Sequence, residues 1–249
     1  SPQWLLPSNE NKDKVSNYSM AFDGVDDYVD TNSPFNSLLQ GTNFTVSLWF
    51  NSSVNTSYDT LISNGYPFQM YFVGNKIKIW MGYPYFLAPF ESVSTLSLST
   101  WYHIAFIKSG NNWLLYINGS LDNSVVNSGT VSTSTDNLTI GKFSGGAYFF
   151  QGNIDEVSIF DTDQSSNVAT IYNGGTPTTI TGAVAHYKLG DSSTFSTNWT
   201  VPDEVGTNDG TSNGMLIDAR VGEAPNSVNN ALSYNMDLID RVEDTPPTP

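Results

Sequence analysis

Two glycine- and asparagine-bearing turns, each placed between short apolar runs, limit the fold of this chain most. Residues 101–107 and 113–117 are short runs of mostly apolar and aromatic side chains, and the turn Gly110-Asn111-Asn112 separates them. Asn118-Gly119 then joins the second run to a third, residues 120–126. Asn and Gly tolerate the positive φ that tight hairpin turns need. The pattern therefore predicts a three-stranded antiparallel meander.

Similar strand signals occur along most of the chain. Residues 44–50 place Phe44, Val46, Leu48 and Phe50 on one side, the period of a half-buried strand. Further strands are expected at 18–22, 28–31, 138–141, 148–160 and 183–189, and one short helix is expected at 165–172, before Gly174-Gly175. More than ten short strands with almost no helix predict an all-β, two-sheet antiparallel sandwich or jelly roll.

Composition excludes several classes of partner. The chain has 249 residues, with 9 Lys plus Arg against 24 Asp plus Glu, and a net charge of −15. Nucleic acid and anionic lipid surfaces would repel such a chain. No run of eighteen apolar residues exists, so no membrane insertion is expected. The first four residues carry no signal pattern, so we expect any leader to be absent or removed. Without cysteine, disulfides and thiolate metal sites are excluded.

Two adjacent carboxylates interrupt the apolar strand predicted at 152–160. Asp155 and Glu156 need partners. Burying an unpaired charge inside a sheet destabilises the fold by several kcal/mol. One solution is a calcium ion, which takes oxygen ligands; Asp23 or Asp191 would then join them. The other is a set of backbone N–H groups and buried hydroxyls. Asp26 and Asp27, in the same acidic segment as Asp23, are interpreted as turn residues.

Aromatic residues are dense in several predicted loops. Sugar C–H faces pack against aromatic rings, while amide and carboxylate groups bond sugar hydroxyls. The candidate carbohydrate-binding residues are Tyr66, Gln69, Trp80, Tyr83, Tyr85 and Tyr148. The alternative is that most of these rings belong to the core or to a subunit interface. As a cluster, residues 80–86 are hard to bury as a strand, and an exposed aromatic patch marks an interaction surface.

No catalytic residues are expected. Asp155 and Glu156 are adjacent, so on a regular strand their side chains point to opposite faces and cannot flank one glycosidic bond. His103 and His186 lie inside predicted strands, where a structural histidine is the simpler interpretation. The chain also lacks a cysteine nucleophile and a Gly-x-Ser-x-Gly elbow.

Five segments in order resemble the LamG-like jelly-roll family, within the concanavalin A-like lectin and glucanase fold. These segments are residues 21–29, 44–50, 101–105, 115–119 and 150–160. The resemblance implies the sandwich fold, and a structural calcium at the closing strand, which many relatives hold. It does not identify a ligand. The Glu-x-Asp-x-Glu type strand of glucanases in this fold is absent.

The resemblance also divides the chain. We expect an N-terminal arm at 1–14, the jelly roll at 15–175 and a C-terminal extension at 176–249. Residues 183–191 resemble the opening strand of the family, which residues 1–17 do not supply. They either open a second, truncated unit or, as we favour, fold back as strand 183–189 on the sandwich. Residues 170–249 also resemble appendage or capsid-surface proteins of marine tailed phages.

The sequence therefore predicts a non-catalytic domain that binds a polysaccharide or glycan surface, with a structural calcium, located extracellularly or on a virion surface. The alternative is a purely structural virion or appendage subunit, in which the aromatic patch and both termini contact further copies of the chain or other virion proteins.

Overall fold

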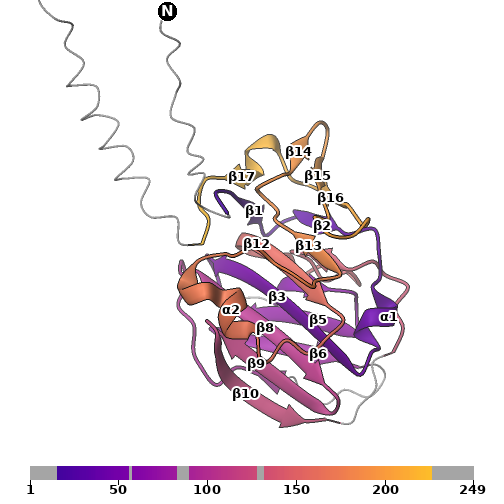
Figure 1. Ribbon diagram of the computed structural model, residues 1–249. Coiled ribbons are helices and arrows are strands. Elements are labelled where there is room, and N and C mark those ends of the chain that lie inside the picture. Colours follow the sequence, from indigo (N-terminus) through magenta and orange to yellow (C-terminus); the bar gives the residue numbers. More distant parts are fainter. Residues whose placement is uncertain (1–15, 56–57, 83–89, 128–131, 226–249) are drawn as a thin grey trace, which may run out of the picture.

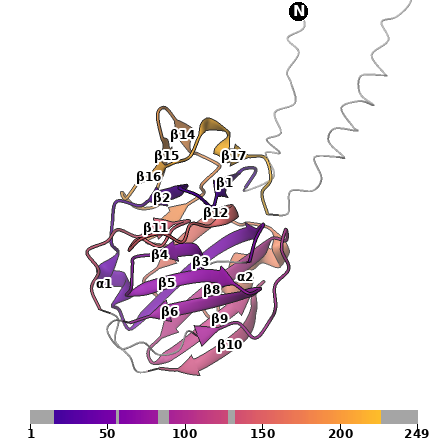
Figure 2. The same ribbon diagram turned by 180° about the vertical axis from the view of Figure 1, so that it is seen from behind.

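Two antiparallel β-sheets pack face to face in the computed structural model (Figures 1 and 2). It describes residues 16–55, 58–82, 90–127 and 132–225. The predicted all-β jelly-roll sandwich is confirmed. The predicted arm, residues 1–14, and residues 226–249 of the extension lie outside the described residues.

The first sheet has eight strands, one of which, β13, pairs with β12 off the main path. In spatial order they are β10 (Ser120–Val126), β9 (Asn112–Ile117), β8 (Tyr102–Ser109), β3 (Asn43–Ser52), β12 (Gln151–Phe160), β1 (Ser19–Asp23) and β17 (Arg220–Val221), with β13 (Ala185–Tyr187) beside β12. Strands β8, β9 and β10 form the predicted meander. Its second turn has Asn118 at φ 48° and Gly119 at φ 78°. Asn and Gly occupy these positions because they tolerate positive φ better than other residues.

The second sheet has nine strands. In spatial order they are β14 (Thr194–Phe195), β15 (Trp199–Val201), β16 (Gly210–Asn213), β2 (Tyr28–Asp30), β11 (Thr139–Ile140), β4 (Asp59–Ser63), β5 (Phe68–Val73), β6 (Lys76–Met81) and β7 (Phe90–Glu91). The core lies between the two sheets. Phe44, Val46, Leu48 and Phe50 of β3 enter it, as their alternation predicts.

The outer face of the first sheet is covered by helix α2 (Val168–Tyr172), which begins three residues later than predicted. Asp163 accepts a hydrogen bond from the Ser165 N–H in the turn before it. Val168 packs against Ala105 and Ile107 of β8. A second short helix, α1 (Asn36–Leu39), and two 3₁₀ turns, Asn173–Gly175 and Ile217–Ala219, complete the described helical structure.

The C-terminal extension contributes to both sheets. Strand β13 runs antiparallel to β12, with His186 opposite Ser158. Strands β14, β15 and β16 extend the second sheet beyond β2 (Figure 1). The sequence after Gly190 shows little apolar periodicity, and these strands were not predicted. They are two to four residues long, too short for a repeating pattern, yet they bury Trp199 and Val201.

None of the helices in the described ranges is long and apolar enough to span a membrane.

Candidate aromatic binding surface

A continuous row of five aromatic rings lies along one side of the second sheet and the loop before β12. The rings of Tyr66 and Phe143 are 5.2 Å apart between centroids, and those of Phe143 and Tyr148 are 6.1 Å apart. Tyr148 lies 5.3 Å from Tyr58, which lies 5.3 Å from Tyr71. Tyr66, Tyr148 and Tyr58 are each about half exposed, at 53%, 48% and 49%. The row therefore offers three solvent-accessible rings on a buried aromatic base.

Strand alternation places the polar side chains beside this row. Phe68, Met70 and Phe72 of β5 enter the core, so Gln69 and Tyr71 lie on the opposite face of the sheet, where they are 8% and 1% exposed. Trp80 of β6 is directly opposite Gln69. The Gln69 side-chain amide donates a 2.7 Å hydrogen bond to the Thr60 hydroxyl, which fixes its orientation.

Tyr148 occupies a conformation that a bulky residue rarely adopts. Its φ is 75°, in the left-handed region. A non-glycine residue there costs about 1–3 kcal/mol, and such residues concentrate at functional sites. The surrounding contacts hold its ring between those of Tyr58 and Phe143. The strain is thus compatible with a ring that is positioned for contact with a ligand.

A cavity of about 270 Å³ opens beside Tyr148. Its lining comes from the turn after β1, the ends of β3 and β4, and the loop into β12: Gly24, Val54, Asp59, Ala147, Tyr148, Phe149 and Gln151. Asp59 is only 2% exposed, and its Oδ2 has no hydrogen-bond donor in the described part of the chain. Burial raises the pKa of Asp59 to about 7.

The structure places the described candidate sugar-binding residues on this side of the molecule. Tyr66 and Tyr148 belong to the ring row, and Gln69 and Trp80 lie on the adjacent outward face. Tyr83 and Tyr85 lie outside the described residues. Sequence reasoning missed Tyr58, Asp59, Tyr71 and Phe143. The carboxylate that begins the otherwise uncharged segment Asp59–Ser63 was the one available signal for the cavity.

Asp155 and Glu156 each have one side-chain partner of their own, at a bulge in β12. The register shifts between Asp155 and Ser158, and Glu156 has φ 49°. The strict alternation assumed for these two residues is therefore wrong at this point. Ser16 Oγ donates to Asp155 Oδ2 at 2.6 Å, and His186 Nε2 lies 2.7 Å from Glu156 Oε2. Burial and the neighbouring Glu156 charge raise the pKa of Asp155 well above its usual range.

The two other predicted calcium ligands lie at different places. Asp191 accepts hydrogen bonds from the N–H groups of Asn17, at 2.9 Å, and Tyr18, and its charge acts on Asp155. Asp23 pairs with Gln151, four positions along β12 from Asp155. The structure therefore brings Asp191 towards Asp155 and Glu156, and leaves Asp23 apart.

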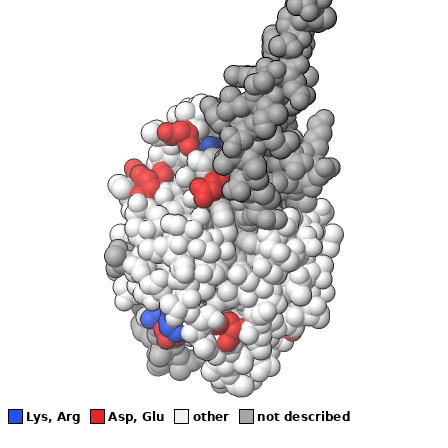
Figure 3. All heavy atoms as spheres, turned by 90° about the vertical axis from the view of Figure 1, so that its left-hand side faces the viewer, with Lys and Arg blue, Asp and Glu red and all other residues white. Residues whose placement is uncertain are grey.

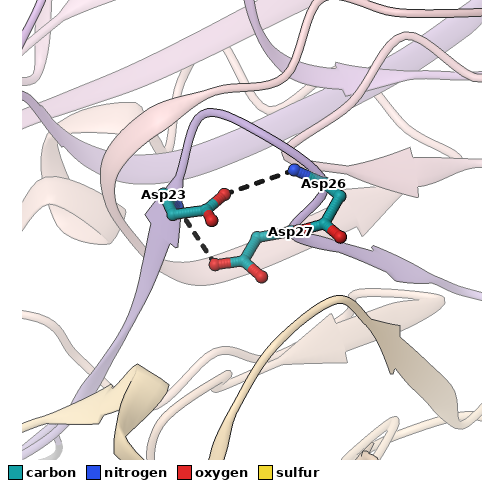
Figure 4. Close-up of side chains that lie close together, drawn as sticks. All are labelled: Asp23, Asp26 and Asp27. Atoms are coloured by element: carbon teal, nitrogen blue, oxygen red, sulfur yellow. Dashed lines mark hydrogen bonds between the residues drawn. The ribbon is translucent and has the colours of Figure 1, made fainter.

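Asp23 instead gathers with Asp26 and Asp27 in the turn between β1 and β2 (Figure 4). Oxygen atoms of these three carboxylates lie within 4.8 Å of one another. Asp23 Oδ1 accepts from the Val25 N–H at 2.7 Å, and Asp27 Oδ2 accepts from the Asp23 N–H at 3.0 Å. The second of these bonds agrees with the turn role expected for Asp27. Burial and the Asp23 charge raise the pKa of Asp27 to about 6.

His103 has a structural environment. It is fully buried, its Nε2 lies 2.7 Å from the Ser47 hydroxyl, and its ring lies near those of Trp49 and Tyr172. Burial lowers its pKa to about 3. The imidazole is therefore neutral and enclosed, without access to a substrate.

Charged side chains are sparse on the surface. Figure 3 shows one face on which a few acidic and basic groups are scattered over a largely uncharged surface. Two lysines in the described ranges show local contacts: Lys78 lies 3.1 Å from Glu91, and Lys108 donates to the Gly41 carbonyl. This arrangement does not suit a polyanionic partner.

Similarity to known structures extends over most of the chain. A candidate carbohydrate-binding protein from Bacteroides ovatus aligns with a TM-score of 0.69 and 18% identity, over 86% of this chain and 62% of that protein. The chain therefore spans less than two thirds of that relative. A SAP-like pentraxin from Limulus polyphemus aligns with a TM-score of 0.51 and 17% identity, over 75% of this chain and 92% of the pentraxin. At these identities the likeness shows the fold alone.

No curated protein matches the chain in sequence. A family model does match, over residues 23–171, from the acidic turn to helix α2. This range contains strands β2 to β12 and the whole aromatic row. The chain therefore belongs to the Laminin_G_3 family of the concanavalin A-like lectin/glucanases superfamily.

Proposed function

We propose that this chain is a non-catalytic carbohydrate-binding domain that contacts a glycan through Tyr58, Tyr148 and Tyr66. The half-exposed ring row carries this proposal. Tyrosines bury large areas at low conformational cost, and their flat faces suit the C–H faces of sugar rings. Gln69, held by Thr60 and largely buried, adds an oriented amide on the adjacent face. Aromatic walls with few oriented polar groups are typical of small-ligand sites.

Catalysis is not part of this proposal. Glycoside hydrolysis uses two carboxylates about 5–9.5 Å apart. Among the described residues that line the cavity, Asp59 is the single carboxylate. Asp155 and Glu156 are enclosed, at 0% and 4% exposure, and lie in the other sheet. A domain that holds a polysaccharide without cleaving it would act in adhesion, outside the cell or on a virion surface.

A structural assembly role is the second candidate, and one observation favours it. Strand β10 is an edge of the first sheet in the described part of the chain, and Val126, Leu121 and Val125 on it are 74%, 53% and 41% exposed. An edge strand with exposed apolar side chains can pair with another chain. In this case copies of the domain, or other virion proteins, would be the partners.

A structural calcium ion belongs to the same proposal, and two groups of oxygen atoms fit its chemistry. One is the turn of Asp23, Asp26 and Asp27. The other lies around the bulge, where Asp155 Oδ1 and Glu156 Oε1 have no hydrogen-bond donor in the described ranges. Calcium takes six to eight such oxygens. Bound there, the ion would stabilise a turn or compensate buried carboxylates, and would leave the tyrosine row unchanged.

Affinity electrophoresis in gels that contain arabinan, galactan, mannan or β-glucan tests the main proposal. We expect at least one polysaccharide to retard the protein, and the double substitution Tyr58→Ala with Tyr148→Ala to abolish the retardation. Leu121→Ala, which truncates an exposed side chain on the other sheet, is the control and should migrate as the unaltered protein does. Unretarded migration in all four gels would overturn the proposal. Retardation that survives the double substitution would remove the tyrosine row from it.

A further inference from the structure

We propose that the cavity beside Tyr148 is a separate subsite that binds one neutral sugar residue, at a chain end, with Asp59 accepting its hydroxyl hydrogens. This inference rests on the proposed carbohydrate-binding function and adds a site and a substrate class to it. The ring row would contact internal residues of the polysaccharide. The subsite would recognise where the chain ends.

The position of Asp59 is the first argument. It begins β4 and is opposite Phe72, a core residue of β5, so its side chain lies at the inner edge of the sandwich. The carboxylate is almost fully buried, and its Oδ2 has no donor in the described part of the chain. A buried acceptor without a donor destabilises the fold, and such groups in native structures call for an explanation. A ligand that supplies O–H donors would provide it.

The shape of the cavity is the second argument. Its volume of about 270 Å³ is below the range of about 300–1,000 Å³ that holds drug-sized ligands. It suits one sugar ring rather than a chain. Gly24 has φ 80°, and a Cβ atom there would lie 2.9 Å from the Cβ of Gln151. The absence of a side chain at Gly24 therefore lets the turn approach Gln151 closely and helps to form the cavity wall.

The lining resembles the chemistry of a sugar site. Phe149 and Val54 are apolar and would contact C–H groups, while Asp59 and Gln151 supply oxygen and amide groups for hydroxyls. Tyr148 belongs to both the cavity and the ring row. A glycan lying on the row would thus reach the cavity with its terminal residue.

The charge of the surroundings selects against acidic sugars. Asp59 is the single charged group of the described lining, and Gly24 lies in the same turn as Asp23, Asp26 and Asp27. A uronic acid or a sulfated sugar would place a second negative charge beside a buried carboxylate. Like charges in an enclosed site repel strongly. The subsite therefore suits a neutral residue.

Isothermal titration of the full chain tests the subsite. The probes are the trisaccharide of each polysaccharide that retards the protein, and trigalacturonate as the acidic counterpart. We expect Asp59→Asn to weaken binding of the neutral trisaccharide by about tenfold, and trigalacturonate not to bind the unaltered protein. Asp161→Asn removes the same charge from an exposed position just after β12 and should leave the affinity unchanged. Ala147→Phe fills the cavity from an exposed position without altering Asp59. It should weaken binding of the neutral trisaccharide as strongly as Asp59→Asn does.

The outcomes separate this inference from the proposed function. A loss of less than twofold in both Asp59→Asn and Ala147→Phe, in variants that melt as cooperatively as the unaltered protein, would overturn the subsite. Binding of trigalacturonate equal to that of the neutral probe would overturn its selectivity. Both results leave polysaccharide retardation through Tyr58 and Tyr148 intact. Failure of every polysaccharide to retard the protein would overturn the proposed function itself.

Discussion

His186 Nε2 lies 2.7 Å from Glu156 Oε2, and this contact joins two strands that are thirty residues apart in sequence. Glu156 lies in the bulge of β12, and His186 lies in β13, the strand that the C-terminal extension adds beside it. Their side chains are 3% and 4% exposed. The backbone N–H of His186 also donates to Asp203 Oδ1 at 3.0 Å. The extension is therefore held to the sandwich by buried polar contacts as well as by strand pairing.

Removing His186 should destabilise the fold strongly. His186→Leu leaves Glu156 buried without its partner, and breaking a buried pair in this way costs about 3–5 kcal/mol. The double substitution His186→Leu with Glu156→Leu should recover part of this loss, because the Glu156 carboxylate is then no longer buried without its partner. Urea denaturation of the three proteins measures these free energies of unfolding. Equal stability of the single and double variants would show that Glu156 does not depend on His186.

The variant Tyr148→Gly should be more stable than the variant Tyr148→Ala. Both substitutions remove the tyrosine ring, but alanine keeps the cost of a positive φ, while glycine adopts φ 75° freely. We expect the free energy of unfolding of the Tyr148→Gly variant to be about 1 kcal/mol higher than that of the Tyr148→Ala variant. At an ordinary loop position glycine would be equal or less stable. Thermal unfolding ranks the two variants, and a reversed order would argue against backbone strain at this residue.

Asp59 should make stability depend on pH. Burial raises its pKa in the folded protein to about 7, whereas an unfolded Asp has a pKa of about 3.9. Between these values the folded state binds more protons, so the contribution of Asp59 to stability is present in acid and is lost as pH rises from about 4 to about 7. Asp59→Asn should remove this loss and be more stable than the unaltered protein at pH 8, by about 1–3 kcal/mol.

The measurement is urea denaturation of both proteins at pH 4.5, 6 and 8. Asp27, whose pKa is raised to about 6, contributes in the same direction and is present in both proteins, so the difference between them isolates Asp59. A difference that stays constant over the three pH values would contradict the raised pKa of Asp59.

Added calcium should raise the melting temperature after treatment with EDTA. At a hundredfold excess over Kd, binding to the folded state contributes about 2.7 kcal/mol. Two variants locate the ion: Asp23→Asn should abolish the rise if calcium binds the turn between β1 and β2, and Asp155→Asn should abolish it if calcium binds at the bulge. Identical melts with and without calcium would remove the ion from the proposal.

Sequence and structure differ most where contacts join distant segments. The spacing of Tyr66 and Gln69 predicts loop and strand positions, but their neighbours Phe143 and Tyr148 lie more than seventy residues further along the chain. Tyr58 immediately precedes β4 and Asp59 begins it, and the single carboxylate of that segment is a weak local signal for a site. Their ring and carboxylate acquire a role only because β4 begins beside the loop that enters β12.

Local backbone structure, by contrast, can be predicted from the sequence. Alternation in residues 44–50 sets which side chains of β3 enter the core, and Asn118-Gly119 sets the hairpin between β9 and β10, because both depend on backbone geometry over a few residues. The partners of Asp155 and Glu156 are instead Ser16 and His186, which only the packing of distant segments brings near. The sequence by itself determined the all-β sandwich, and tertiary packing decided which polar and aromatic groups share a site.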